Sequence, residues 1–266
     1  MNLAEAARDV ILTPDPYEKC RQSRHMAMLW QSGQITTVGI AKAPDRPGRP
    51  ERPVLLDPSD VPRRKINRGT LGRIALLHAL SHIELNAVDL AWDIIVRFSG
   101  AELPTEFFDD WVRVADEEAR HFTLLTNRLR DFEAAYGDLP AHDGLWDAAL
   151  ETQHSLTARL AIVPLVLEAR GLDVTPMMIG KLRDVDDPIS AEILETIYAD
   201  EIGHVRIGKR WFAFECERQG KEPETLWREL VTKHFRGDLK PPFNIDARDQ
   251  AGLPEGWYTN ISGTGS

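Results

Sequence analysis

The sequence contains a pattern of glutamate and histidine that occurs twice and is suited to metal binding. In each copy a single glutamate is followed by a Glu-x-x-His quartet, 34 residues later in the first copy (84 to 118) and 33 in the second (168 to 201). The six residues are Glu84, Glu118, His121, Glu168, Glu201 and His204. Carboxylate oxygens and imidazole nitrogens are common ligands of divalent metals. The pattern therefore predicts a metal site.

The spacing within each quartet indicates a helix. Residues three apart on a helix lie on one face and one turn apart, so Glu118 and His121 can reach the same ion. Glu201 and His204 have the same relation. A single glutamate on a neighbouring helix completes each set, and two sets form one centre for two ions.

Charge favours a filled centre. Four glutamates bring four negative charges, which two divalent cations cancel. Without metal, four carboxylates inside a helical bundle would meet desolvation and mutual repulsion, or would have to hold protons. The alternatives are helices joined by salt bridges, or a centre that keeps a single ion.

Three further residues adjoin the predicted ligands. Glu117 and Asp200 each precede a quartet, where a carboxylate can accept the second imidazole N–H and fix the tautomer. The alternative is a solvated charge, which is equally favoured for Glu117. Tyr198 comes one turn before Glu201, so it could line the cavity beside the metals, with core packing as the alternative.

Other histidines fit the site less well. Glu151 and His154 repeat the quartet spacing but would need a further partner helix, so we interpret them as exposed or as a helix cap. His78 and His82 are one turn apart, yet His82 points about 160° away from Glu84 on a helix. We expect both of these histidines to be structural.

Composition narrows the class of protein. The chain has 266 residues and a formal net charge of −10, which gives no global attraction to nucleic acid or acidic membranes. Its two cysteines, Cys20 and Cys216, are too few for a disulfide framework. No uninterrupted apolar run is long enough for a membrane span, and the first residues do not resemble a signal peptide. We expect a soluble cytoplasmic protein.

The periodicity predicts an all-α protein, because almost no segment alternates with period two. Predicted helices lie within 2–32 (broken near 13–16), 70–99, 105–137, 143–171, 188–220 and 223–236, with a short one near 175–183 and an irregular tail. Pro164 is expected to kink its helix one turn before Glu168. We predict N-terminal helices and a strap in 1–69, a four-helix bundle in 70–220, and a C-terminal helix and tail in 221–266.

The strap between residues 43 and 62 holds six prolines and several arginines. These arginines could contact phosphates of RNA, but acidic neighbours offset half the charge. Ion pairs that hold the strap on the bundle are the favoured interpretation. In the tail, Lys240-Pro241-Pro242-Phe243-Asn244 is an ordered-looking loop that could cover a pocket mouth, and Trp257 and Tyr258 could anchor the tail.

At the paired quartets the chain resembles the ferritin-like superfamily of diiron-carboxylate proteins. Including the strap and the Lys-Pro-Pro-Phe-Asn segment, it is similar to an uncharacterised bacterial ferritin-like family of unknown function, distantly similar to tRNA-modifying diiron hydroxylases. The resemblance implies a ferritin-like four-helix bundle in which the six residues bind two iron ions, with Glu118 and Glu168 as bridging carboxylates. Glu117 departs from the aspartate that many relatives carry.

The resemblance implies an oxidoreductase that activates dioxygen to hydroxylate or dehydrogenate an organic substrate. Such an enzyme needs a small-molecule substrate and an external electron donor. One alternative is a protein that oxidises or stores iron. Another is a dimanganese protein with catalase or peroxidase activity, since the ligand set also accepts manganese. A helical scaffold without enzymatic activity is the remaining alternative, and no sequence feature indicates an oligomeric state.

Overall fold

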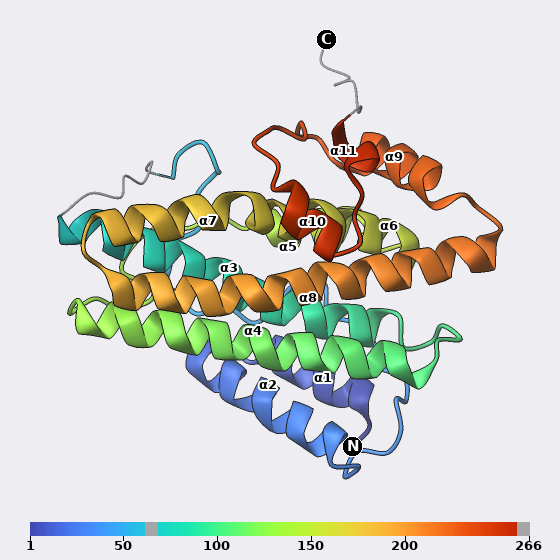
Figure 1. The fold of residues 1–266 in the computed structure, drawn as a ribbon. Coiled ribbons are helices and arrows are strands. Elements are labelled where there is room, and N and C mark those ends of the chain that lie inside the picture. Colours follow the sequence, from blue (N-terminus) through green and yellow to red (C-terminus); the bar gives the residue numbers. More distant parts are fainter. Residues whose placement is uncertain (62–68, 260–266) are drawn as a thin grey trace. The chain divides into compact units, whose positions relative to one another are not determined.

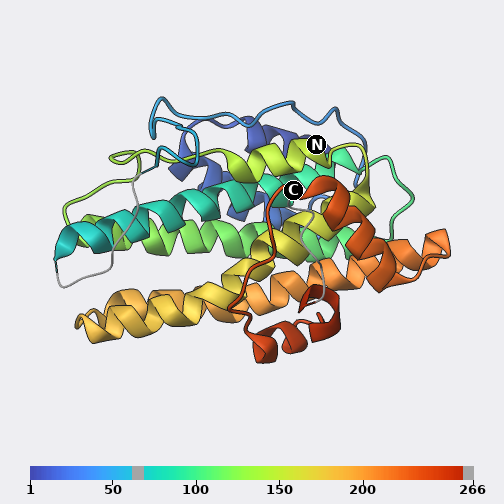
Figure 2. The same cartoon turned by 90° about the horizontal axis from the view of Figure 1, so that it is seen from above.

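The computed structural model describes residues 1–61 and 69–259, and its chain divides into two compact units, Met1–Trp146 and Asp147–Ser266. Figures 1 and 2 show the fold. Throughout the described ranges the regular elements are helices, and the only extended pairing is an isolated bridge between Leu55 and Ala141. The predicted all-α class is confirmed. The three-part division at residues 69 and 220 stays a prediction.

The first unit is built on two long helices, α3 (Thr70–Arg97) and α4 (Thr105–Asp131), which lie side by side. Two shorter helices, α1 (Leu3–Leu12) and α2 (Pro16–Gln31), pack against them. The break between α1 and α2 lies where the sequence predicted it. There Asp15 caps α2 by accepting the Glu18 amide, and Pro16 takes the first helical position.

The strap after α2 is irregular and is held by buried charge. Arg49 pairs with Asp89 of α3, and Asp89 also binds the Lys19 ammonium at 2.6 Å. Lys19 donates to the Gly48 carbonyl as well. The chain needs glycine at position 48, because a Cβ there would lie 2.2 Å from the Leu12 carbonyl oxygen. Ion pairs of Arg46 and Arg49 therefore hold this part of the strap, while residues 62–68 of the predicted 1–69 segment lie outside the described residues.

The second unit contains the hairpin of α7 (Ala169–Asp184) and α8 (Pro188–Gln219). The prediction of one helix over 143–171 was wrong. The chain there forms α5 (Gly144–Glu151), α6 (Leu156–Ile162) and a π-helix, η1 (Val163–Glu168), before α7. Ser155 starts α6 by accepting the Ala158 amide, and the Arg159 guanidinium binds the Ala149 carbonyl at the end of α5. These polar contacts stabilise a break that the hydrophobic period does not reveal.

The π-helix contains Pro164, so the distortion predicted near Glu168 is present as a wider helical turn. The proline ring fits against α8 at Gly208, where a Cβ would lie 2.3 Å from the Pro164 Cβ. A second proline, Pro176, lies inside α7. It cannot donate to the Leu172 carbonyl, which instead accepts Asn244 Nδ2 at 3.1 Å.

The C-terminal part begins with α9 (Pro223–His234), close to the predicted 223–236. The tail is less irregular than predicted, since it forms α10 (Ile245–Gln250) and α11 (Glu255–Thr259). Trp257 and Tyr258 are buried, and the Trp257 ring lies 5.6 Å from that of Trp227. The predicted anchoring of the tail is confirmed.

By length and composition, α3 is the one described helix that could cross a membrane. However, 72% of its most apolar stretch is buried inside the protein. Buried Asp89 and Asp93 also lie on this helix. These features are those of a buried core helix.

Candidate metal centre

The first predicted ligand set meets inside the first unit. Glu84 lies on α3, and Glu118 and His121 lie one turn apart on α4; all three side chains are buried. His121 Nδ1 lies 3.2 Å from Glu84 Oε2 and 3.3 Å from Glu118 Oε2. Ligand atoms of the three residues lie within 4.8 Å of one another, so this group could hold a metal ion.

The electrostatics of this set favour a cation. Burial raises the pKa of the Glu84 carboxyl well above its usual value, and the neighbouring Glu118 carboxylate raises it further. The hydrogen bond from His121 acts in the opposite direction. Because desolvation and like charge both oppose ionisation, a proton or a cation must neutralise this group. A divalent ion can take the place of the proton.

The second predicted set lies in the second unit. Glu201 and His204 are one turn apart on α8, with His204 Nδ1 3.7 Å from Glu201 Oε1. His204 is fully buried, whereas 14% of the Glu201 side chain is exposed. Glu168 is the last residue of η1, which packs against α8, and is partly buried. The second pair is therefore looser and more open than the first.

The three residues predicted beside the ligands are all partly buried. Glu117 precedes Glu118 on α4, and Asp200 precedes Glu201 on α8. Their role as acceptors for imidazole stays a prediction. Tyr198, one turn before Glu201, has its hydroxyl hydrogen-bonded by Asn244 Nδ2 at 2.8 Å.

The Lys240–Asn244 segment docks on α7 and α8, which sequence reasoning only partly anticipated. The Arg170 guanidinium donates to the carbonyls of Lys240 and Pro242. The Asn244 amide donates to Asp173 Oδ1 at 3.0 Å, and buried Arg248 binds both oxygens of Asp173. Asp173, Arg170 and Arg248 are the residues that hold this segment. Sequence reasoning could not pair them, because their contacts depend on tertiary structure.

His78 and His82 are structural, as expected. His78 Nε2 accepts the Gly137 amide at 2.9 Å. His82 Nε2 donates to the His142 carbonyl, which leaves Nδ1 to accept the Tyr136 hydroxyl at 2.8 Å. Burial and the nearby Arg49 lower the pKa of His82 to about 3. His82 is therefore neutral and fully engaged away from the predicted ligands.

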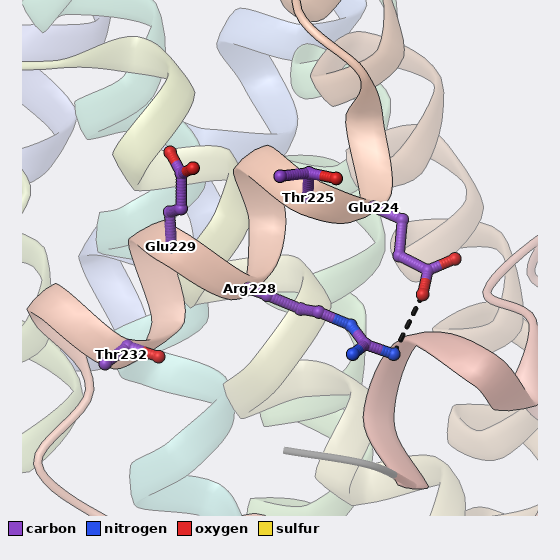
Figure 3. Close-up of a pocket in the computed structure, with 5 residues that line it drawn as sticks. All are labelled: Glu224, Thr225, Arg228, Glu229 and Thr232. Carbon is purple, nitrogen blue, oxygen red and sulfur yellow. Dashed lines mark ion pairs between the residues drawn. The ribbon is translucent and has the colours of Figure 1, made fainter. Parts of the chain in front are cut away.

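A surface hollow of ≈ 650 Å³ lies on α9 (Figure 3). It is lined by Glu224, Thr225, Arg228, Glu229 and Thr232. Arg228 pairs with Glu224 at 2.8 Å, which neutralises much of its charge. The hollow has no histidine or cysteine in its lining, and its chemistry does not resemble that of the Glu84 set.

The family model described as "Protein of unknown function (DUF455)" matches residues 12–259. The chain belongs to this family. An uncharacterized protein of Haemophilus influenzae (strain ATCC 51907 / DSM 11121 / KW20 / Rd) is 38% identical over 258 residues, covering 91% of this chain and 88% of its own. No solved structure matches the sequence.

The DUF455 match includes all six predicted ligands and the Lys240–Asn244 segment. The family match therefore spans both predicted ligand sets and the docked tail, and is not limited to one helix hairpin. The family description names no activity for the DUF455 chain.

Proposed function

We propose that this protein is a ferritin-like diiron oxidoreductase. In this proposal Glu84, Glu118, His121, Glu168, Glu201 and His204 bind two iron ions. The iron pair would supply dioxygen activation for hydroxylating or dehydrogenating an organic substrate, with electrons from a separate reductase. The observation that carries the proposal is the convergence of three buried ligand-type side chains from α3 and α4.

The donor atoms of this group suit one metal ion. Two ligand atoms bound to the same ion lie about 2.9–3.5 Å apart, since metal–ligand bonds are about 2.0–2.2 Å long. His121 Nδ1 lies 3.2 and 3.3 Å from the nearest oxygens of Glu84 and Glu118. Only small side-chain shifts would be needed to bind an ion, so the group supports the proposal.

The types of ligand favour iron or manganese over zinc. Four carboxylates and two imidazoles supply oxygen and nitrogen donors, and none of the six ligands is a thiolate. Such a set, with a Glu-x-x-His pair from each of two helices, is the arrangement found in diiron and dimanganese carboxylate bundles. The resemblance of the sequence to diiron proteins makes iron the proposed metal, with manganese as the alternative.

The chain's own residues would control what reaches the ions. His121 and His204 are fully buried, so they bind from the dry side of the site. Glu201 is partly exposed, which makes its carboxylate the better candidate to shift when a substrate or dioxygen approaches. Tyr198 lies one turn before Glu201, and Asn244 donates a hydrogen bond to the Tyr198 hydroxyl. Both side chains could contact the substrate.

RNA is the less favoured substrate. Arg46 and Arg49 of the strap pair with Asp143 and Asp89, so their charge is already used within the protein. A small molecule is the proposed substrate class. The protein is proposed to act in the cytoplasm, without a membrane.

Metal content tests the proposal. Protein purified from its native host is analysed by elemental mass spectrometry, and an iron-57 sample by Mössbauer spectroscopy. Two coupled irons per chain are expected. Two manganese ions would redirect the proposal to peroxide chemistry, and a metal-free protein that cannot be reconstituted would contradict it.

Iron loading separates the enzyme from the iron-handling alternative. Under aerobic addition of ferrous iron, uptake should stop at two irons per chain. Uptake of many more would favour iron storage. A Glu118→Ala variant serves as the control, because it should take up neither ion of the pair stably.

A further inference from the structure

A second group of metal-type ligands lies at the ends of α5 and α9 in the second unit. Glu151 is the last residue of α5, His154 follows in the turn before α6, and His234 is the last residue of α9. His234 Nδ1 lies 3.8 Å from Glu151 Oε1, and the two imidazole rings lie 5.4 Å apart between centroids. None of these three residues belongs to the six proposed iron ligands.

The position of His234 is unusual for a histidine with no further role. Only 4% of its side chain is exposed, and among the described residues its Nδ1 atom is buried with no hydrogen-bond partner. The 3.8 Å to Glu151 exceeds the length of a hydrogen bond, which is about 3.2 Å at most. Buried polar atoms normally have a partner, so this nitrogen points to a missing one.

The Glu151–His234 distance and the separation of the two imidazole rings are compatible with an ion between these side chains. A nitrogen and an oxygen on one tetrahedral zinc ion lie about 3.4 Å apart, given bonds of about 2.0–2.2 Å. The observed 3.8 Å needs an approach of only a few tenths of an ångström. Two imidazoles on one such ion have centroids about 5 Å apart, close to the observed 5.4 Å. The ligand atoms of the three residues do not all lie within 4.8 Å of one another, so the exposed His154 side chain must turn to bring a nitrogen to the ion.

The charges around His234 also permit binding. Burial lowers the pKa of His234, and nearby Lys233 and His154 lower it further, while Glu151 opposes them. His234 is therefore neutral at neutral pH, and a metal does not have to displace a proton from it. The Glu151 carboxylate, 47% exposed, supplies a negative charge beside His234.

We propose that Glu151, His154 and His234 bind one zinc-class divalent ion, with the fourth tetrahedral position open to water. Two imidazoles and one carboxylate form the donor set that zinc accepts with an open site. The ion would join the end of α9 to the turn between α5 and α6. This site is additional to the proposed iron pair and does not depend on it.

The test is zinc titration of the full chain already loaded with iron. Calorimetry should show one further Zn²⁺ per chain, and Co²⁺ in its place should give the visible absorption of a tetrahedral site. His154→Ala should weaken this binding at least tenfold. The His154 side chain is exposed, so its removal should not change the fold. His25→Ala removes an exposed histidine of α2 and should leave zinc binding unchanged.

A second variant guards against misfolding. His234→Asn should abolish the zinc event while iron content and the unfolding temperature without zinc remain close to those of the wild type. The proposal is overturned if the iron-loaded protein binds no further zinc, or if His154→Ala binds zinc as tightly as His25→Ala does. If the wild-type chain takes up no iron but still binds one zinc ion, and His154→Ala weakens that zinc binding, only the proposed function is contradicted.

Discussion

The two predicted ligand sets use the same residue types but differ in how firmly their helices hold them. In the first, α3 and α4 are continuous helices, and His121 Nδ1 lies 3.2 and 3.3 Å from two carboxylates. In the second, Glu168 is the last residue of a π-helix, and His204 Nδ1 lies 3.7 Å from Glu201 Oε1. Repeated spacing therefore predicts ligand type, while local helix geometry decides how closely the ligands approach before metal binds.

This difference indicates distinct tasks within the proposed centre. A buried, closely spaced set binds an ion with little rearrangement, because its geometry is already organised. A looser set with a partly exposed glutamate can change its coordination when another molecule binds. π-helical turns inside α-helices frequently occur at functional sites. We therefore expect the first set to control affinity and the second to control reactivity.

Removing one glutamate from each set gives the largest expected effect and can break the comparison. Glu118→Ala should weaken metal binding by more than about 100-fold, since even indirect partners of metal ligands contribute about 10–100-fold. Glu201→Ala should lose less affinity but more turnover. Metal titration followed by oxygen-consumption assays measures both.

Two exposed glutamates on the same helices are the controls, Glu106→Gln on α4 and Glu192→Gln on α8. Both should behave like the wild type. If Glu118→Ala retains two metals per chain, the ligand prediction is wrong. Equal losses of affinity in the two alanine variants would remove the proposed difference between the sets.

The metal-free protein offers a second comparison, because Glu84 should cost stability when it ionises. Its folded-state pKa is raised, so the folded state holds a proton that the unfolded state, with a pKa near 4.3, releases first. Stability should therefore fall as pH rises from about 4.3 towards the raised value. Glu84→Gln should stabilise the metal-free protein at pH 8 by on the order of 1–3 kcal/mol, measured by urea unfolding in chelator.

His82, on the same helix, serves as the control, because its contribution to stability changes with pH in the opposite direction. Its pKa is lowered to about 3 in the fold, so its contribution is present above the unfolded value near 6.5 and is lost as pH falls below it. His82→Gln should remove a slope of about 1.4 kcal/mol per pH unit between those values. If neither substitution changes the pH dependence of the free energy of unfolding, the pKa values of Glu84 and His82 are not shifted in these directions.

The third test concerns the π-helix and its fit against α8. Gly208→Ala would place a Cβ 2.3 Å from the Pro164 Cβ, so it should lower the free energy of unfolding by about 1–3 kcal/mol. Gly180→Ala on α7 meets nothing within 4 Å, and should instead raise it by about 0.5–1 kcal/mol. Thermal or urea unfolding distinguishes the two.

A double substitution shows whether the contact is specific. With Pro164→Ala in the background, Gly208→Ala should cost much less, because its clash partner is gone. Additive effects would mean that the proline does not require the glycine. Such a result would also argue against a role for the π-helix in positioning the second ligand set.

Several features could be predicted from the sequence because they depend on local chemistry. The helix period indicated α3, α4 and α8, the prolines near residues 13–16 marked the break before α2, and the predicted end of α8 near residue 220 was close to the observed one. The residue types of the first ligand set were likewise readable from spacing. The break at Ser155 was not, because Arg159 stabilises it through contacts that depend on tertiary structure. The metal-type group at His234 was missed for the same reason, since α5 and α9 are far apart in sequence.

The smallest expected effect concerns the tail segment that docks beside the second set. Asn244 donates to the Leu172 carbonyl, left without its helical partner by Pro176, and to the Tyr198 hydroxyl. Asn244→Ala should therefore lower the free energy of unfolding by about 1–2 kcal/mol. Asp246→Asn, at an exposed position of α10, is the control.

The same variant sharpens the comparison of the two ligand sets. If the tail positions the Tyr198 turn of α8, Asn244→Ala should lower turnover with iron content unchanged, because Glu201 follows Tyr198 by one turn. The first set should keep its affinity, since its ligands lie on α3 and α4. A loss of both metals in this variant would mean that the tail supports the whole centre and that the two sets do not divide affinity and reactivity between them.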